Sequence, residues 1–211
     1  MNKISTLILF FLCLGNCFSQ NKTTDDLIRI AEFHLKESVG ENLFNDFEYN
    51  SHSYYRYKNK RGKNKWKKIE RGKKIKNRLD KAEIRFDFGN VEFAKLEVPK
   101  TFNVVLDADL NIIKKINTKR IPDYILKNQP SNWLTPMELD SIVALQNLKP
   151  SEYPLKKEVR FNNKTEVYYW QIENTLYQEK CLGDYERLII DPITGVILKR
   201  KEERYWVLHC N

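Results

Sequence analysis

The sequence predicts an α+β protein in which two units, each a helix followed by antiparallel strands, form one compact protein with a basic inserted loop. The main observation is an internal repeat, because residues 102–115 can be laid over residues 186–199 without a gap. Each copy has helix-start signals upstream and an alternating strand pattern between helix and hairpin. We therefore expect a first unit at 21–128 and a second unit at 129–211.

The N-terminus has the three parts of an export signal. Lys3 stands before an apolar run from Leu7 to Leu14, and small or polar residues surround Ser19. This predicts a signal peptide at 1–20, cleaved near Ser19 or Gln20, and a periplasmic, envelope-associated or secreted protein. A lipoprotein modified at Cys17 is the alternative, although Asn16 is larger than the residue usual before a lipidated cysteine. The rest of the sequence predicts no membrane-spanning segment.

The first unit begins with an amphipathic helix. Thr23 or Thr24 precedes two aspartates that suit a helix N-terminus, and apolar residues then recur every fourth position until Gly40. Further on, Ile84, Phe86 and Phe88 alternate with charged residues, as in a half-buried antiparallel strand.

Each copy then forms a β-hairpin with the same turn chemistry. The first apolar run ends at Asp107 or Asp191, and the connection closes with Asn111 or Gly195, two residue types that tolerate a left-handed backbone. Asp107 and Asp109 could together bind calcium, but the second copy has no equivalent pair. We therefore interpret both aspartates as turn caps and predict no metal site.

In the second unit, the segment beginning at Thr135 is a capping box with Pro136 at the first helical position. Leu134 and Leu139 are placed to form a hydrophobic staple, and the helix is predicted to continue until Pro150. A strand containing Tyr168, Trp170 and Ile172 follows.

The C-terminal segment is expected to extend the last strand through Tyr205–Leu208. Cys181 and Cys210 are the cysteines that remain after signal cleavage, and an even pair in an exported protein favours a structural disulfide. A metal site is the competing interpretation, but the spacing is poor for it.

The segment from Arg56 to Arg78 is strongly basic. It has thirteen Lys or Arg residues and one acid, Glu70, so its charge is +12 while the whole chain has +9. Three tyrosines lead into it, and cations interleaved with aromatics can hold polyanions. Two interpretations stay open: an anion-binding element, or a solvated flexible loop. The candidate anion-binding residues are Lys58, Lys60, Arg61, Lys63, Lys65, Trp66, Lys67, Lys68, Arg71, Lys73 and Lys74.

A family resemblance covers the second half. Val167–Glu173, followed by Glu186–Leu198 with its turn from Asp191 to Gly195, resembles a PepSY-type domain. The first half is similar only as a divergent copy, since Leu110-Asn111 stands where Thr-Gly would be. The same ending more weakly resembles immunity-type proteins with an NTF2-like fold. The PepSY resemblance implies an extracytoplasmic accessory protein, often a partner of peptidases or envelope proteins, without catalytic residues.

The sequence contains no catalytic constellation that we recognise. His34, His52 and His209 do not form a metal-binding or catalytic spacing, and no phosphate-binding glycine loop is present. We predict a non-catalytic protein without a cofactor that binds a protein partner. The alternative is a module that binds an anionic polymer or a lipid surface through the basic segment. An enzyme with an unfamiliar site has no positive support.

Overall fold

The computed structural model describes residues 22–206 except Glu97, and it has two antiparallel sheets and a few helices. The predicted α+β class is thereby confirmed. The predicted signal peptide, Cys17, His209 and Cys210 lie outside the described residues. Among residues 22–206, none of the helices has both the length and the hydropathy needed to cross a bilayer.

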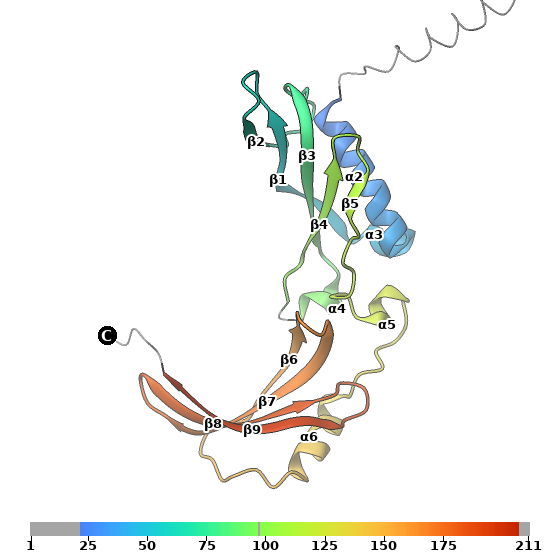
Figure 1. Ribbon diagram of the computed structural model, residues 1–211. Helices are drawn as coiled ribbons and strands as arrows, with labels where there is room; N and C mark the ends of the chain where they lie inside the picture. Colours follow the sequence, from blue (N-terminus) through green and yellow to red (C-terminus); the bar gives the residue numbers. More distant parts are fainter. Residues whose placement is uncertain (1–21, 97, 207–211) are drawn as a thin grey trace, which may run out of the picture. The chain divides into compact units, whose positions relative to one another are not determined.

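The elements follow one another as drawn in Figure 1. The helices are α2 (Thr24–Val39), α3 (Glu41–Phe44), α4 (Val91–Ala94), α5 (Asp123–Leu126) and α6 (Pro136–Ala144). The strands are β1 (Phe47–Lys58), β2 (Asn64–Lys68), β3 (Arg78–Phe88), β4 (Thr101–Asp107), β5 (Ile112–Lys114), β6 (Lys156–Asn162), β7 (Val167–Gln178), β8 (Leu182–Ile190) and β9 (Ile197–Trp206).

The described chain divides into two compact units. Unit 1 consists of residues 22–38, 48–87 and 101–116, and unit 2 of residues 39–47, 88–100 and 117–206. The five-stranded sheet, in the order β2-β1-β3-β4-β5, belongs to unit 1, apart from single end residues of β1 and β3. The four-stranded sheet, in the order β6-β7-β8-β9, belongs to unit 2.

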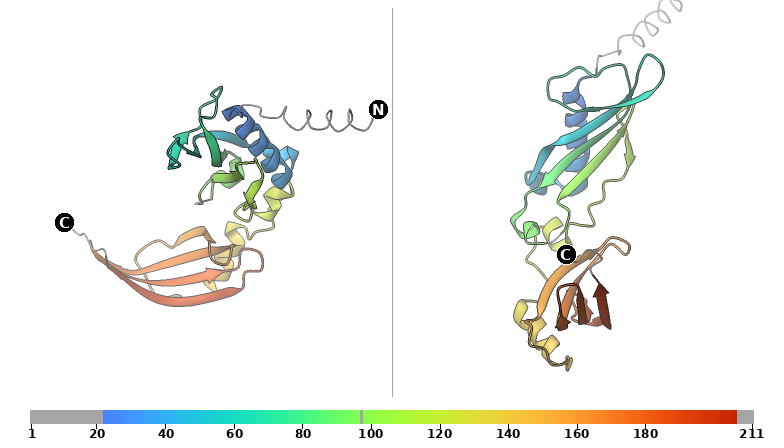
Figure 2. Two further views of the ribbon diagram at one scale, coloured as in Figure 1. Left: turned by 45° about the horizontal axis from the view of Figure 1, so that its top comes forward. Right: turned by 90° about the vertical axis from the view of Figure 1, so that its left-hand side faces the viewer.

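In unit 1, α2 covers one face of the five-stranded sheet (Figures 1 and 2). The apolar stripe of α2 is fully buried at Leu27, Ala31 and Leu35, and Ile84 and Val104 on the sheet are equally inaccessible. The helix ends where predicted, because Gly40 has a φ of 84°. A positive φ is the backbone conformation that glycine adopts at least cost.

In unit 2, α6 packs on the four-stranded sheet through a small apolar cluster. Leu139 and Val143 are buried against Ile172, Leu188 and Ile190. The predicted capping box is present, since the Thr135 side chain accepts from the Glu138 amide while Glu138 accepts from the Thr135 amide.

The helix α6 ends at Ala144, so the prediction that it continues to Pro150 is wrong. The Gln146 and Asn147 carbonyls accept hydrogen bonds from the Arg200 guanidinium at 2.8 and 3.3 Å. Asn147 has a φ of 48°, which turns the chain out of the helix. A tertiary contact with β9 therefore sets this helix end.

The two hairpin turns are alike at the aspartate and differ at the closing residue. Asp107 Oδ1 accepts from the amides of Asp109 and Asn111, each at 2.8 Å, and Asp191 Oδ1 accepts from those of Ile193 and Thr194 at 3.0 and 2.7 Å. The Asp107 amide, however, donates to the Asn111 carbonyl, whereas the Asp191 amide donates to that of Val196.

The first turn is thus one residue shorter than the second. Its left-handed residue is Leu110, with a φ of 73°, and the expectation that Asn111 takes this role is wrong. Gly195 does have a positive φ, also 73°. The gapless alignment of the repeats therefore slips by one residue after the turn.

Residues 56–68 of the basic segment belong to a β-hairpin, so the description of this part as a loop is wrong. Residues 56–58 end β1, residues 64–68 form β2, and these two strands pair from Tyr54↔Lys68 to Lys58↔Asn64. Residues after β2 are fastened to the start of α2, since the Thr24 amide donates to the Lys73 carbonyl at 2.8 Å and the Ile75 amide to that of Lys22 at 3.1 Å.

Candidate functional site

The register of the basic hairpin decides which of its side chains face α2. Tyr55 is only 1% exposed and therefore lies on the face that α2 covers. Residues opposite each other in antiparallel strands lie on the same face, and neighbours along a strand alternate. The other face, turned away from α2, carries the residues that we call the hairpin face: Tyr54, Arg56, Lys58, Trp66 and Lys68.

Trp66 is the centre of the hairpin face. It is 52% exposed, and two cations lie over its ring: Arg56 Cζ at 5.7 Å from the ring centroid and Lys81 Nζ at 5.5 Å. Both distances are within the range of a cation–π interaction. Arg56 comes from β1, Trp66 from β2 and Lys81 from β3, so neighbouring strands assemble this group.

Asp80 fixes the orientation of Arg56. The Arg56 Nε donates to Asp80 Oδ2, and the two side chains are 33% and 26% exposed. Among the described residues, no partner is found for the two terminal nitrogens of Arg56. The guanidinium thus contacts a carboxylate at its Nε edge and lies over the ring of an indole.

The turn of the hairpin holds further cations in an ordered loop. The Asn59 side chain accepts from the amides of Arg61 and Lys63, both at 3.0 Å, and the Gly62 amide donates to the Asn59 carbonyl at 2.9 Å. Lys60, Arg61 and Lys63 are exposed there.

Arg71, Lys73 and Lys74 have a different setting from the hairpin. Arg71 lies 3.9 Å from Glu32 of α2 and over the Tyr49 ring at 5.2 Å. The Lys73 carbonyl accepts from Thr24, and Thr23 and Lys74 form an isolated β-bridge. This stretch attaches the hairpin to α2, so its main-chain contacts are structural.

For most cations of the hairpin, the described residues supply no acid that would neutralise them. Within residues 22–206, no ion pair is found for the lysines of β1, β2 and the turn between them: Lys58, Lys60, Lys63, Lys65, Lys67 and Lys68. Each is exposed except Lys67, which is half-buried opposite Tyr55. The hairpin therefore presents uncompensated positive charge on an ordered backbone.

The other predicted residues are not part of the hairpin face. Cys181 is disulfide-bonded, while its predicted partner, Cys210, lies outside the described residues. His34 is 3.5 Å from Glu37 on α2, and His52 is exposed beside Asn50. No group of three or more potential metal ligands occurs in the part of the chain that the structure describes.

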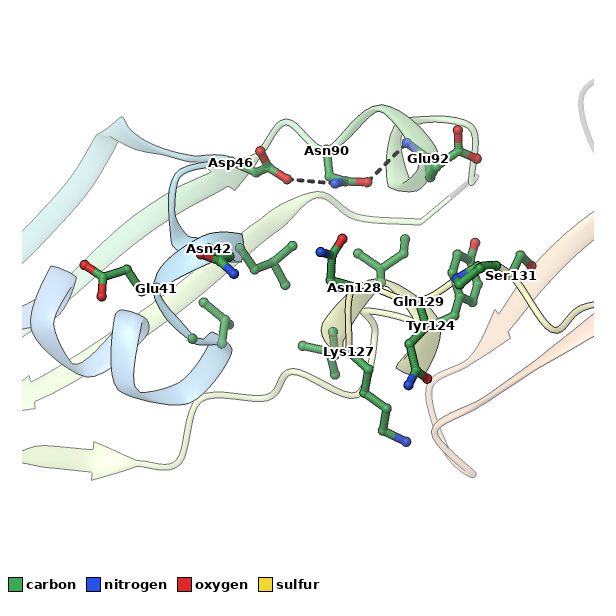
Figure 3. Close-up of a pocket in the computed structure, with 16 residues that line it drawn as sticks. Glu41, Asn42, Asp46, Asn90, Glu92, Tyr124, Lys127, Asn128, Gln129 and Ser131 are labelled. Atoms are coloured by element: carbon green, nitrogen blue, oxygen red, sulfur yellow. Dashed lines mark hydrogen bonds between the residues drawn. The ribbon is translucent and has the colours of Figure 1, made fainter.

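Unit 2 also has a pocket of about 580 Å³, between α3, α4 and α5 (Figure 3). Its acids have partners: Asp46 accepts from Asn90 at 2.7 Å, and Glu92 pairs with Lys95 at 2.7 Å. Asn90 also caps α4. The remaining polar lining consists of three side-chain amides, together with Glu41, Tyr124, Lys127 and Ser131. With three acids and one lysine in its lining, this pocket does not suit a polyanion.

The sequence did not indicate two members of the site, Asp80 and Lys81. Both lie just beyond the basic run, which ends at Arg78. The pairing of β3 with β1 could have indicated them, because it places side chains of β3 beside those of β1 on the same face of the sheet. For Tyr54, the sequence indicates only that it belongs to a run of tyrosines before the basic segment.

Comparison with known proteins supplies no further assignment. No protein-family model matches this chain, and no curated protein matches it either.

Proposed function

We propose that the protein is an exported, non-catalytic binding protein that holds a polyanionic ligand on the hairpin of its first unit. The observation that supports this most is the group of six lysines on an ordered hairpin for which no ion pair is found among the described residues. An anionic polymer would supply the missing counter-charges and release its own counterions, which favours binding at moderate ionic strength.

The order of the hairpin adds to this proposal. A flexible basic loop would lose conformational entropy when it binds, whereas strands that are already paired and tied to α2 lose little. The accessory role towards a peptidase or an envelope protein, which the PepSY resemblance implies, stays a prediction.

The proposal is tested by retention of the purified protein on immobilised heparin. Replacing Lys58, Lys60, Lys63 and Lys68 with Gln should lower the affinity about 100-fold at low salt, because several ionic contacts are removed together. The matched control replaces four exposed lysines elsewhere, Lys114, Lys115, Lys164 and Lys199, and should change the affinity less than threefold. Equal losses in both variants would show that only net charge matters and would contradict the proposal.

A further inference from the structure

We infer that Arg56, Trp66 and Lys81 form a preorganised subsite for one anionic group of an acidic polysaccharide. This inference rests on the proposed function, since it names the point of the hairpin at which the polymer is gripped. It goes beyond a general basic patch because an uncharged residue, Trp66, and an acid, Asp80, contribute to binding by holding the cations in place.

The geometry holds the two cations in place before any ligand arrives. Arg56 Cζ and Lys81 Nζ lie 5.7 and 5.5 Å from the centre of the Trp66 ring, and Asp80 engages the Nε edge of Arg56. Fixed side chains lose less rotamer entropy on binding than the free lysines around them. The terminal nitrogens of Arg56 can then donate two parallel hydrogen bonds to the oxygens of a sulfate or carboxylate.

The same geometry favours a polysaccharide over single-stranded nucleic acid. Proteins that bind single strands gain much of their affinity by stacking bases on exposed aromatic rings. Here the Trp66 ring already has two cations over it, so a base would have to displace them. Recognition therefore comes from charge at fixed positions, and an acidic polysaccharide provides it without needing a stacking surface.

Two acids of β3, Asp80 and Glu83, allow an experiment to distinguish this subsite from a simple patch of charge. Asp80 positions Arg56, whereas Glu83 pairs with Arg85 at 2.8 Å and touches neither Trp66 nor Arg56 in the described contacts. Replacing either acid by Ala adds the same unit of positive charge. A patch that acts through net charge would bind heparin more tightly in both cases.

The experiment measures heparin affinity of the purified protein by titration at several salt concentrations. Glu83→Ala should bind slightly more tightly, and Asp80→Ala about threefold more weakly, because Arg56 loses its orientation. Trp66→Ala should lose about tenfold in affinity while the slope of log affinity against log salt stays the same, since no charge is removed. Trp66→Phe keeps a ring and should lose less.

The outcomes separate the two proposals. If Trp66→Ala binds as the unmodified protein does and both acid variants bind more tightly, the subsite is overturned while the lysine-dependent binding stands. If the four-lysine variant also keeps full affinity, the proposed function itself fails. A 20-nucleotide oligothymidylate that binds more tightly than heparin and depends on Trp66 would overturn the polysaccharide assignment.

Discussion

The four-stranded sheet and the hairpin end of the five-stranded sheet differ in how their charged side chains are paired. On the four-stranded sheet, Glu173 lies between Lys156 and Arg187, and Glu203 bonds both Arg187 and Lys201, so acids and bases alternate across the strands. On the five-stranded sheet, the hairpin end carries lysines for which the described residues offer no acid.

This difference indicates where a charged ligand would bind. A face whose charges are paired internally has little field to attract a polyanion, whereas clustered like charges repel one another until a counter-charge arrives. A ligand that binds the folded hairpin would therefore also stabilise it.

The largest effect on stability is expected in the four-stranded sheet, on its helix side. Glu186 is 2% exposed, and it accepts from the Lys149 amide at 2.9 Å and from Arg200 Nε at 2.8 Å. Glu186→Ala should lower the free energy of unfolding by about 2–3 kcal/mol, because the Lys149 amide, the Arg200 guanidinium and the buried Asn174 amide lose their acceptor. Glu202→Ala, at an exposed pair with Lys149, is the control, and urea unfolding measures both.

The same carboxylate gives this sheet a pH dependence. Burial alone would raise the pKa of Glu186, but hydrogen bonds from Lys149, Arg200 and Asn174 outweigh it and hold the pKa below 4.5. The folded state thus favours the ionised form, so its stabilisation is present above pH 4.5 and is lost as the pH falls through the lowered pKa. In Glu186→Gln, the free energy of unfolding should depend less on pH in the acid range. An unchanged pH dependence would contradict this role of Glu186 and its hydrogen bonds.

A smaller effect separates the two repeat turns. Gly195→Ala places a side chain at a φ of 73° and a Cβ only 2.5 Å from Ile142 Cδ1, so we expect a loss of about 1–2 kcal/mol. Leu110→Gly in the shorter turn should cost nothing or stabilise slightly, since Leu110 already has a left-handed backbone. Thermal unfolding compares them, and a stabilising Gly195→Ala would refute the described turn.

The smallest effect tests whether the ion pairs of the four-stranded sheet keep it from binding a polyanion. Glu203→Gln removes an acid that pairs with both Lys201 and Arg187, and Arg187 keeps Glu173 as a partner. The heparin affinity of the protein should therefore rise about two- to threefold. Glu158→Gln, which removes one acid from Arg160 alone, is the matched control and should gain less. No gain in either variant would show that unpaired cations alone do not create a binding face.

Local signals in the sequence were enough for part of this fold. The capping box at Thr135, the apolar stripe of α2 and the alternation around Phe86 each depend on neighbouring residues, and the structure agrees with them. The end of α6 and the slip after Asp107 could not be predicted, because Arg200 and the length of a turn determine them. The strand β1 was missed because polar residues interrupt its pattern from Asn50 to His52.

The candidate site was predictable in composition and not in arrangement. The basic run marks the hairpin, but its division into two faces depends on the pairing of β1 with β2. The group at Trp66 needs Asp80 and Lys81 from β3, which lie beyond the run. Pairing between strands brings these residues together, and a count of charges along the chain does not reveal it.

The central claim is most directly tested by the salt dependence of heparin binding by the unmodified protein. If the unpaired lysines of the hairpin bind the polymer, log affinity should fall linearly with log salt, with a slope of about −4 or steeper, and the four-lysine variant should have a clearly shallower slope. A shallow slope shared by the unmodified protein and this variant would contradict the account.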